Sequence, residues 1–399
     1  MQAVPRHANA RVRPSARRAD VADAPIRHAR RKRRHTALGR AGITGLALVL
    51  FVGTGGALAY SEMQGNINRQ DISSLLGNDR PSPAAPDDAL EGRWLNILIL
   101  GSDSRAGEND DGSGVGGMRS DTAMIAHISA DRSRVELVSI PRDTLVDIPS
   151  CTLPNGTQTR PQSQAMFNSA FSMGGQSGDV GAAAACTIKT VEQLTGVFID
   201  DFVVVDFAGF INMVDALGGV PMDVPEPIND PQADLHLQAG YQVLNGHDAL
   251  GFARVRKSVG DGSDISRIGR QQELVAAIAR EALGKNLLTD LPALYKFLDA
   301  TTSTLTTGQT VGEIPTLAGL ANSLRGLDAA GIAFATMPFD WAGARVVPAD
   351  EADAMWEALR TDAPIDATLT GTGEAPPEPP TGEPAAGTPA ASGVPGTAG

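Results

Sequence analysis

Arginines and aspartates recur together in four short segments of this sequence. The segments are Gly101-Ser102-Asp103-Ser104-Arg105, Arg119-Ser120-Asp121-Thr122, Pro141-Arg142-Asp143-Thr144 and Ala253-Arg254-Val255-Arg256, the last continuing to Arg267, Arg270 and Gln271. A guanidinium offers a rigid fork of donors that matches phosphate oxygens. Carboxylates among arginines can pair with them, or can bind Mg²⁺ together with phosphate oxygens. The residue types therefore predict a site for a diphosphate and a divalent metal ion.

The spacing of these residues predicts which side chains lie together. In extended backbone, residues two apart point to the same face. The expected same-side pairs are Asp103 with Arg105, Arg119 with Asp121, and Arg254 with Arg256. On a helix, Arg267, Arg270 and Gln271 share a face. Any one Arg–Asp pair is more often a surface ion pair, but so many arginines from distant segments favour a built anion site.

Strands and helices that would position these segments alternate over residues 93–362. Expected strands are Leu95–Leu100, Thr122–Ser129, Val135–Ile140, Phe202–Val205, Gly240–Leu244 and Leu250–Val255. Expected helices are Ala182–Leu194, Phe207–Leu217, Ile265–Leu283, Val311–Leu324 and Ala349–Leu359. This alternation predicts an α/β fold, a three-layer α/β/α sandwich with a central mixed β-sheet. Several arginine segments lie at strand ends, where ligands bind in α/β sheets.

The N-terminal region predicts a single membrane anchor before this domain. Residues 41–60 are uncharged and long enough, at roughly 30 Å, to cross a hydrocarbon core as one transmembrane helix. Residues 1–40 carry twelve Lys or Arg and two Asp, which predicts a basic cytoplasmic tail and an extracytoplasmic domain. The alternative is a signal peptide cleaved after Ala59. Residues 61–92 are interpreted as a stalk, and residues 363–399 as a disordered tail rich in Pro, Gly, Thr and Ala.

Charge and cysteine content exclude some classes of function. The net charge is −13, and the part after residue 40 is more acidic still, so we expect no nucleic acid among the partners. The two cysteines, Cys151 and Cys186, do not have the spacing of zinc ligands. Outside the membrane they could form a disulfide instead.

Six segments together resemble the LytR–CpsA–Psr family over about residues 93–283. They read NILILGSDSR, MRSDTAMIAHI, VSIPRDTLVDIP, TVEQLTGVFIDDFVVVDFAGFINMVDALGGV, ALGFARVR and SRIGRQQE. The resemblance implies a membrane-anchored phosphotransferase that moves a glycopolymer from an undecaprenyl diphosphate carrier onto peptidoglycan. It also implies an α/β sandwich with a lipid-binding hydrophobic pocket, contact with membrane lipid, and Mg²⁺ or Mn²⁺ as cofactor.

The resemblance carries site roles over to matching positions. It implies that Asp103 and Asp121 bind the metal. It implies that seven arginines face the diphosphate beside Gln271, namely Arg105, Arg119, Arg142, Arg254, Arg256, Arg267 and Arg270. The general base could be Asp103 or Asp143. Many family members have Lys-Ile-Asn where this chain has Met166-Phe167-Asn168, so a role for that lysine does not transfer.

Two other functions fit the same residues. One is a metal-dependent polyprenyl-diphosphate pyrophosphatase with water as acceptor. The other is a non-catalytic regulator that binds wall polymers. Neither the glycopolymer nor the oligomeric state follows from the sequence. The apolar stretches Phe202–Val205 and Phe207–Leu217 could line a lipid groove or could be ordinary core.

Overall fold

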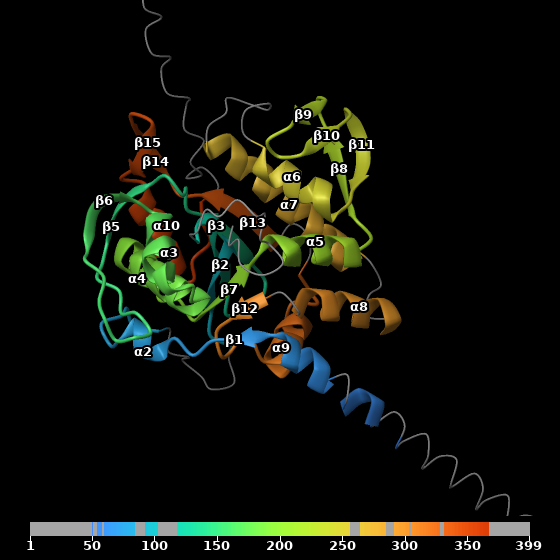
Figure 1. Ribbon diagram of the computed structural model, residues 1–399, viewed down its shortest axis with the longest axis horizontal. Helices are drawn as coiled ribbons and strands as arrows, with labels where there is room; N and C mark the ends of the chain where they lie inside the picture. Colours follow the sequence, from blue (N-terminus) through green and yellow to red (C-terminus); the bar gives the residue numbers. More distant parts are fainter. Residues whose placement is uncertain are drawn as a thin grey trace, which may run out of the picture. The chain divides into compact units, whose positions relative to one another are not determined.

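The computed structural model describes residues 50, 54–57, 60–83, 92–102, 118–255, 264–284, 291–302, 305–327 and 331–366 (Figure 1). The chain divides into two compact units, Met1–Ala59 and Tyr60–Gly399, and the fold described below is that of the second. Within the described ranges, no helix is long and apolar enough to cross a membrane. The basic tail 1–40, most of the predicted anchor and residues 367–399 lie outside those ranges.

A seven-stranded sheet lies at the centre of the second unit. Its order is β1 (Asn68–Arg69), β12 (Leu305–Thr307), β7 (Asp201–Val205), β2 (Leu95–Ser102), β3 (Ser120–Ile128), β4 (Val135–Ser139) and β13 (Ile332–Thr336). β2 pairs in parallel with β7 and antiparallel with β3. β4 pairs antiparallel with β3 and in parallel with β13. The predicted α/β fold with a central mixed sheet is therefore confirmed.

Apolar residues of the central strands bury both faces of this sheet. Leu98 and Leu100 of β2 are fully buried on one face, in a core shared with helices α3 (Ser169–Gly174), α4 (Val180–Thr195) and α10 (Ala352–Arg360). Ile97 packs on the other face, in a cluster that includes residues of α9 (Ile314–Ser323). Successive strand residues point to opposite faces, so an unbroken apolar run is what a sheet covered on both sides requires.

A second cluster of apolar residues joins the elements that follow β7. These are α5 (Phe207–Ala216), β8 (Val220–Val224), β9 (Ile228–Asp230), β10 (Leu235–Leu237), β11 (Gly240–Leu244), α6 (Gly246–Arg254) and α7 (Asp264–Gly284), drawn in light green to yellow in Figure 1. Val214, Leu235, Phe252 and Leu274 lie in its core. Helix α8 (Leu291–Thr302) follows α7 and contacts α5.

Two short hairpins and a disulfide complete the other side of the domain. Strand β5 (Leu145–Ile148) pairs with β6 (Gln162–Met166), and β14 (Phe339–Ala342) pairs with β15 (Arg345–Pro348). Cys151, just after β5, is bonded to Cys186 of α4, with 5.3 Å between the Cα atoms. The expected disulfide is therefore present, and it ties the loop between β5 and β6 to the helix on which the main core is built.

The predicted strand Leu250–Val255 is wrong, because these residues lie in and directly after helix α6. The side chain of Asn245 caps the helix by accepting a hydrogen bond from the backbone N–H of Asp248 at 2.9 Å. Ala249 and Phe252, three residues apart, are both buried. That spacing belongs to a helix, so Arg254 ends α6 and does not form a same-side strand pair with Arg256, which lies outside the described residues.

The interpretation of residues 61–92 as a stalk also needs correction in its described part. β1 forms the outermost strand of the central sheet, paired with β12. Helix α2 (Ser73–Leu76) follows, and Ile72 and Leu76 are buried in the main core. At the other end of the domain, Ile365 of the predicted tail still donates its backbone N–H to Glu136. The folded domain therefore extends beyond residues 93–362 at both ends. A few apolar residues, Ile72 and Leu76, were enough to pack the otherwise polar segment before residue 93 against the core.

Candidate active site

The arginine–aspartate segments that the structure describes meet at one end of the central sheet. This site end comprises the C-terminal ends of β2, β4, β7 and β13 and the start of β3. Register brings the segments together, because Ser102 is opposite Ser120, and Ile140 donates its backbone N–H to the carbonyl of Ala123. Asp103, Arg105 and Arg256 lie outside the described residues, so their predicted roles are not tested.

Arg142 lies between two carboxylates. Its Nη1 donates a hydrogen bond to Oδ1 of Asp121 at 2.6 Å, and its Nε lies 3.6 Å from Oδ1 of Asp143. Its side chain is 17% exposed, whereas that of Asp121 is 36% exposed. A charge-assisted hydrogen bond of this length is among the stronger contacts in proteins. The pair therefore orients a largely buried guanidinium beside a carboxylate that is open to solvent.

The turn that carries Arg142 and Asp143 is held by its neighbours. The backbone N–H of Thr144 donates to the carbonyl of Pro141 at 3.1 Å, which closes the turn. The backbone N–H of Asn168 donates to the carbonyl of Arg142 at 3.1 Å. The segment Met166-Phe167-Asn168 therefore supports the turn through its backbone, which does not depend on the side chain at position 166.

Helix α7 contributes two buried arginines. Arg267 is 2% exposed and donates its Nη2 to the backbone carbonyl of Asp121 at 3.0 Å. Arg270 is 8% exposed and donates its Nη2 to the carbonyl of Val255 at 2.6 Å. Gly269, between them, is exposed, so the two arginines share the buried face that the helical spacing predicted. Burying a cation is costly unless it is well paired, so each of these guanidinium groups needs hydrogen-bond acceptors close to it.

The end of α6 forms the other side of this region. Gln271 donates its Nε2 to the carbonyl of Ala253 at 3.2 Å, which links α7 to the last turn of α6. The next residue, Arg254, is exposed, and its guanidinium carbon lies 4.8 Å from the centre of the Phe207 ring. Arg119 is also exposed, directly before β3. Two contact networks thus meet on α7, one around Asp121 and one around the end of α6.

Sequence reasoning missed two residues that contact this region. Nη1 of Arg345, on β15, lies 3.1 Å from Oδ1 of Asp143. Gln272 donates its Nε2 to Oγ of Ser139 and to the carbonyl of Ala335, which fixes α7 against the ends of β4 and β13. Gln272 directly follows Gln271 and could have been found from the motif. Arg345 is isolated in the sequence and carried no such signal.

The described part of the site offers few metal ligands. No group of three or more His, Cys, Asp or Glu residues that could hold a metal ion occurs among the residues that the structure describes. Asp121 is the described member of the predicted metal pair, and one of its oxygens accepts a hydrogen bond from Arg142. The metal site stays a prediction.

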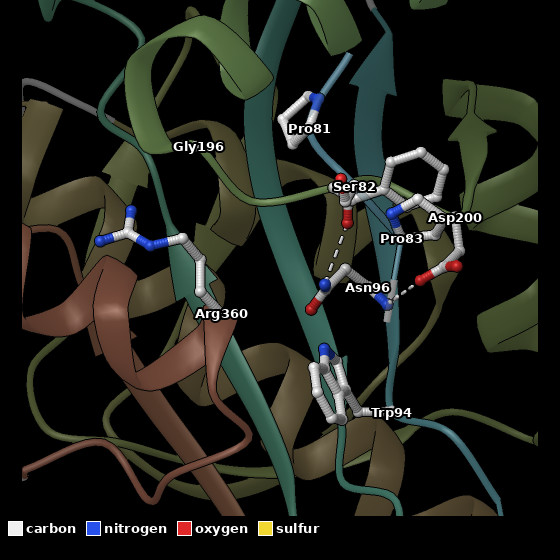
Figure 2. A pocket seen from close by; sticks show the side chains of 9 residues that line it. Pro81, Ser82, Pro83, Trp94, Asn96, Gly196, Asp200 and Arg360 are labelled. Atoms are coloured by element: carbon white, nitrogen blue, oxygen red, sulfur yellow. Dashed lines mark hydrogen bonds between the residues drawn. The ribbon is translucent and has the colours of Figure 1, made fainter. Parts of the chain in front are cut away.

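A pocket of about 400 Å³ lies at the opposite end of the sheet, near the N-terminal ends of β2 and β7 (Figure 2). Trp94, Phe198 and Arg360 are among the residues that line it. Asn96 donates its Nδ2 to the carbonyl of Phe198 at 3.0 Å, and its backbone N–H to Asp200 at 2.8 Å. These polar groups serve the fold, and the length of β2 separates the pocket from the arginines. We therefore place the candidate site at the site end.

Several known proteins are similar to this chain in sequence or in fold. The LytR_cpsA_psr family model matches residues 59–361. The probable cell wall biosynthesis protein LcpB of Corynebacterium glutamicum is 32% identical over 278 residues, 66% of this chain and 61% of LcpB. TagV of Bacillus subtilis, named a polyisoprenyl-teichoic acid–peptidoglycan teichoic acid transferase, is 29% identical over 238 residues, 58% of this chain and 54% of TagV. The chain thus spans between half and two thirds of the length of these relatives.

Two solved structures have the same fold. The LytR-Csp2A-Psr enzyme from Actinomyces oris superposes with a TM-score of 0.53 at 21% identity, covering 74% of this chain and 96% of that one. The crystal structure of Bacillus subtilis TagV superposes with a TM-score of 0.52 at 22% identity, covering 69% and 100%. Together with the family match over most of the sequence, these findings show that the chain belongs to the LytR–CpsA–Psr family.

Proposed function

We propose that this protein is a membrane-anchored phosphotransferase that moves a glycopolymer from a polyprenyl diphosphate carrier onto peptidoglycan. The observation that carries the proposal is the position of Arg142, which is largely buried between Asp121 and Asp143 at the site end. The names of two relatives point the same way, because TagV is named a teichoic acid transferase acting on peptidoglycan and LcpB a probable cell wall biosynthesis protein.

Arginine charge at the site end would bind the diphosphate. Arg142 and Arg267 both contact Asp121, one through its carboxylate and one through its backbone carbonyl. Arg119, directly before β3, and Arg254, at the end of α6, are both exposed. Their side chains could therefore contact a ligand from solvent. Preorganised cations in a partly buried site stabilise charge that develops on phosphate oxygens more strongly than they would in water.

Mg²⁺ or Mn²⁺ would be held by Asp121 together with Asp103. The donor chemistry fits, because carboxylate oxygens are hard ligands and Asp121 is open to solvent on one side. Arg142 binds Oδ1 of Asp121 and so orients the carboxylate that would hold the ion. When bound, such an ion neutralises charge on the diphosphate oxygens.

The reaction would be a substitution at the sugar-side phosphorus. The acceptor hydroxyl of peptidoglycan forms a new P–O bond, the bond from that phosphorus to the bridging oxygen breaks, and polyprenyl phosphate leaves. The hydroxyl proton passes to a carboxylate, either Asp143 or Asp103. Phosphoryl transfer depends mainly on positioning and on charge stabilisation. Arg142 contributes to both, because its contacts with two carboxylates fix the direction of its guanidinium.

The anchor and a lipid-binding surface belong to the same proposal. Residues 41–60 would cross the membrane, with the N-terminus in the cytoplasm and the domain outside. Of the two apolar stretches, Phe202 and Val204 lie in the core between sheet and helices. In α5, Phe207, Phe210, Ile211 and Met213 are only half-buried. We therefore assign the polyprenyl chain to α5, which would present it beside Arg254 and its Phe207 contact.

The test is transfer by the full-length chain in detergent, with a polyprenyl-diphosphate-linked glycopolymer, peptidoglycan and Mg²⁺. We expect wall-linked polymer and polyprenyl phosphate in equal amounts, and loss of both in Asp121→Ala, because that variant removes the partner of Arg142 and a proposed metal ligand. Product release without peptidoglycan would indicate a pyrophosphatase. Donor binding without turnover would indicate a regulator. Wild-type transfer by Asp121→Ala would refute the site assignment.

A further inference from the structure

Arg345 lies outside the arginine motifs and yet contacts the candidate site. Its Nη1 is 3.1 Å from Oδ1 of Asp143, and the same oxygen is 3.6 Å from Nε of Arg142. Arg142 in turn donates to Asp121. The four side chains therefore form a row of alternating charge, Asp121–Arg142–Asp143–Arg345, with the last member supplied by a hairpin near the C-terminal end of the domain.

The backbone fixes the position of Arg345. It is the first residue of β15 and is paired with Ala342 across a two-residue turn, in which Gly343 has a φ of 68°. A glycine with positive φ suits the first position of such a turn. The next residue, Val346, is buried in the main core and forms a parallel bridge with Thr144, which follows Asp143. Arg345 and Asp143 thus precede two residues that are bridged, and they are brought side by side by the fold.

Arg345 changes the electrostatic balance around Asp143. An unpaired carboxylate at position 143 would compete with an anionic ligand for the guanidinium of Arg142, since the two residues are adjacent in one turn. Arg345 supplies a second cation to the same oxygen of Asp143. Nε of Arg142, at 3.6 Å, is then beyond hydrogen-bonding distance, while its Nη1 donates to Asp121 at 2.6 Å.

We propose that Arg345 is a positioning residue that holds Asp143 and so limits the competition of Asp143 with the phosphate groups of the ligand for Arg142. This inference rests on the proposed function, because it takes Arg142 as a diphosphate contact. What it adds is that Arg345 acts on the site through Asp143 and does not itself contact the ligand. The side chain of Arg345 is 41% exposed, so its removal leaves no buried cavity.

The test compares Arg345→Ala and Arg345→Lys with Arg360→Ala. Arg360 is the matched control, because it is a similarly exposed arginine paired with a carboxylate, Glu357, away from the site end. We expect kcat/KM for transfer to fall about tenfold in Arg345→Ala, with both KM and kcat affected, because Arg142 stays in the site but is displaced, which costs less than its removal. Arg345→Lys should recover part of the loss. Arg360→Ala should transfer polymer like the wild type, and the two Arg345 variants should keep the wild-type unfolding midpoint.

A double-mutant cycle separates positioning from direct contact. The full-length chain and its Arg345→Ala, Asp143→Asn and double variants are titrated with farnesyl diphosphate, which reports binding without turnover. We expect Arg345→Ala to raise Kd several-fold, Asp143→Asn to bind at least as tightly as the wild type, and Arg345→Ala to have no effect in the Asp143→Asn background. An equal loss in both backgrounds, loss of binding in Asp143→Asn, or no change in Arg345→Ala would each overturn the proposal.

The two proposals fail in different ways. If the wild type binds farnesyl diphosphate with the expected coupling but transfers no polymer, the proposed function fails and the role of Arg345 stands. If the wild type transfers polymer and Arg345→Ala matches it in turnover and in Kd, the role of Arg345 fails and the proposed function stands.

Discussion

Both ends of the central sheet carry arginine–carboxylate pairs, and one pair from each end differs in which partner is the less exposed. At the site end, Arg142 is 17% exposed and its partner Asp121 is 36% exposed. At the opposite end, Arg93 is 36% exposed and its partner Asp200 is 8% exposed. In these two pairs the charged residue types are the same, but the less exposed group is the cation at the site end and the carboxylate at the opposite end.

The carboxylates of the opposite end are buried because the fold uses them. Asp200 accepts a hydrogen bond from the backbone N–H of Asn96, and Asp362 accepts one from the backbone N–H of Ala130. Glu192 accepts one from the backbone N–H of Ile199 at 3.0 Å. Arg80, Arg93 and Arg134 pair with these carboxylates, and in each pair the carboxylate is the less exposed partner. Such pairs satisfy backbone donors at the ends of strands, which is a structural role.

At the site end, three cations lie inward instead, namely those of Arg142, Arg267 and Arg270. Arg267 and Arg270 are buried on α7 and donate to backbone carbonyls, while the carboxylate of Asp121 stays accessible. A buried guanidinium beside a solvent-exposed carboxylate does little to stabilise the fold, because desolvating the cation costs free energy. It suits the binding of an anion together with a metal ion. The contrast teaches that an arginine less exposed than its carboxylate partner, as in the Arg142–Asp121 pair, distinguishes the candidate site from the structural pairs of the opposite end.

The largest expected effect is on transfer by Arg142→Ala. Removing a preorganised donor from a charge-stabilising site typically costs about a hundredfold or more in turnover, and here it also releases Asp121 and Asp143 from their shared partner. Arg93→Ala breaks the pair at the opposite end and should transfer polymer like the wild type. The measurement is the initial rate of wall-linked polymer formation for both variants. Equal losses would mean that the two ends do not differ as proposed.

The contrast between the ends also shows which features could be predicted from the sequence. Unbroken apolar runs predicted β2 and β3, and the spacing of Arg267 and Arg270 predicted the buried face of α7, because these signals are local. The short run before Arg254 fits a strand or a helix equally well, and the cap from Asn245 decided for the helix. Burial of one partner in a pair, like the contact of Arg345 with Asp143, depends on segments far apart in the chain and has no local signal.

A smaller effect, on stability rather than on turnover, is expected for His127→Ala at the opposite end. His127 is fully buried, and its ring nitrogens contact Asn96 at 2.7 Å and Asp362 at 3.1 Å. Truncation leaves a cavity and two polar partners without their contact, which costs about 2–4 kcal/mol of unfolding free energy. Arg142→Ala breaks a partly exposed pair and should cost about 1 kcal/mol or less. Urea unfolding of both variants, followed by circular dichroism, checks the order, and the reverse order would contradict it.

The smallest effect concerns the pH dependence of that stability. Burial lowers the pKa of His127 below its usual 6.5, although hydrogen bonding to Asp362 and the charge of Glu136 act against the shift and Arg134 acts with it. The unfolded chain therefore binds a proton more readily than the folded one. The sign follows: the contribution of His127 to stability is complete above pH 6.5 and declines as the pH falls below that value. Unfolding free energies of the wild type and His127→Asn, measured from pH 7.5 to 5.5, should thus converge towards low pH, because only the wild type has this group to protonate. Parallel curves would mean that protonation of His127 does not destabilise the folded state. The desolvation of charge would then matter less at the opposite end of the sheet than the burial of its carboxylates suggests.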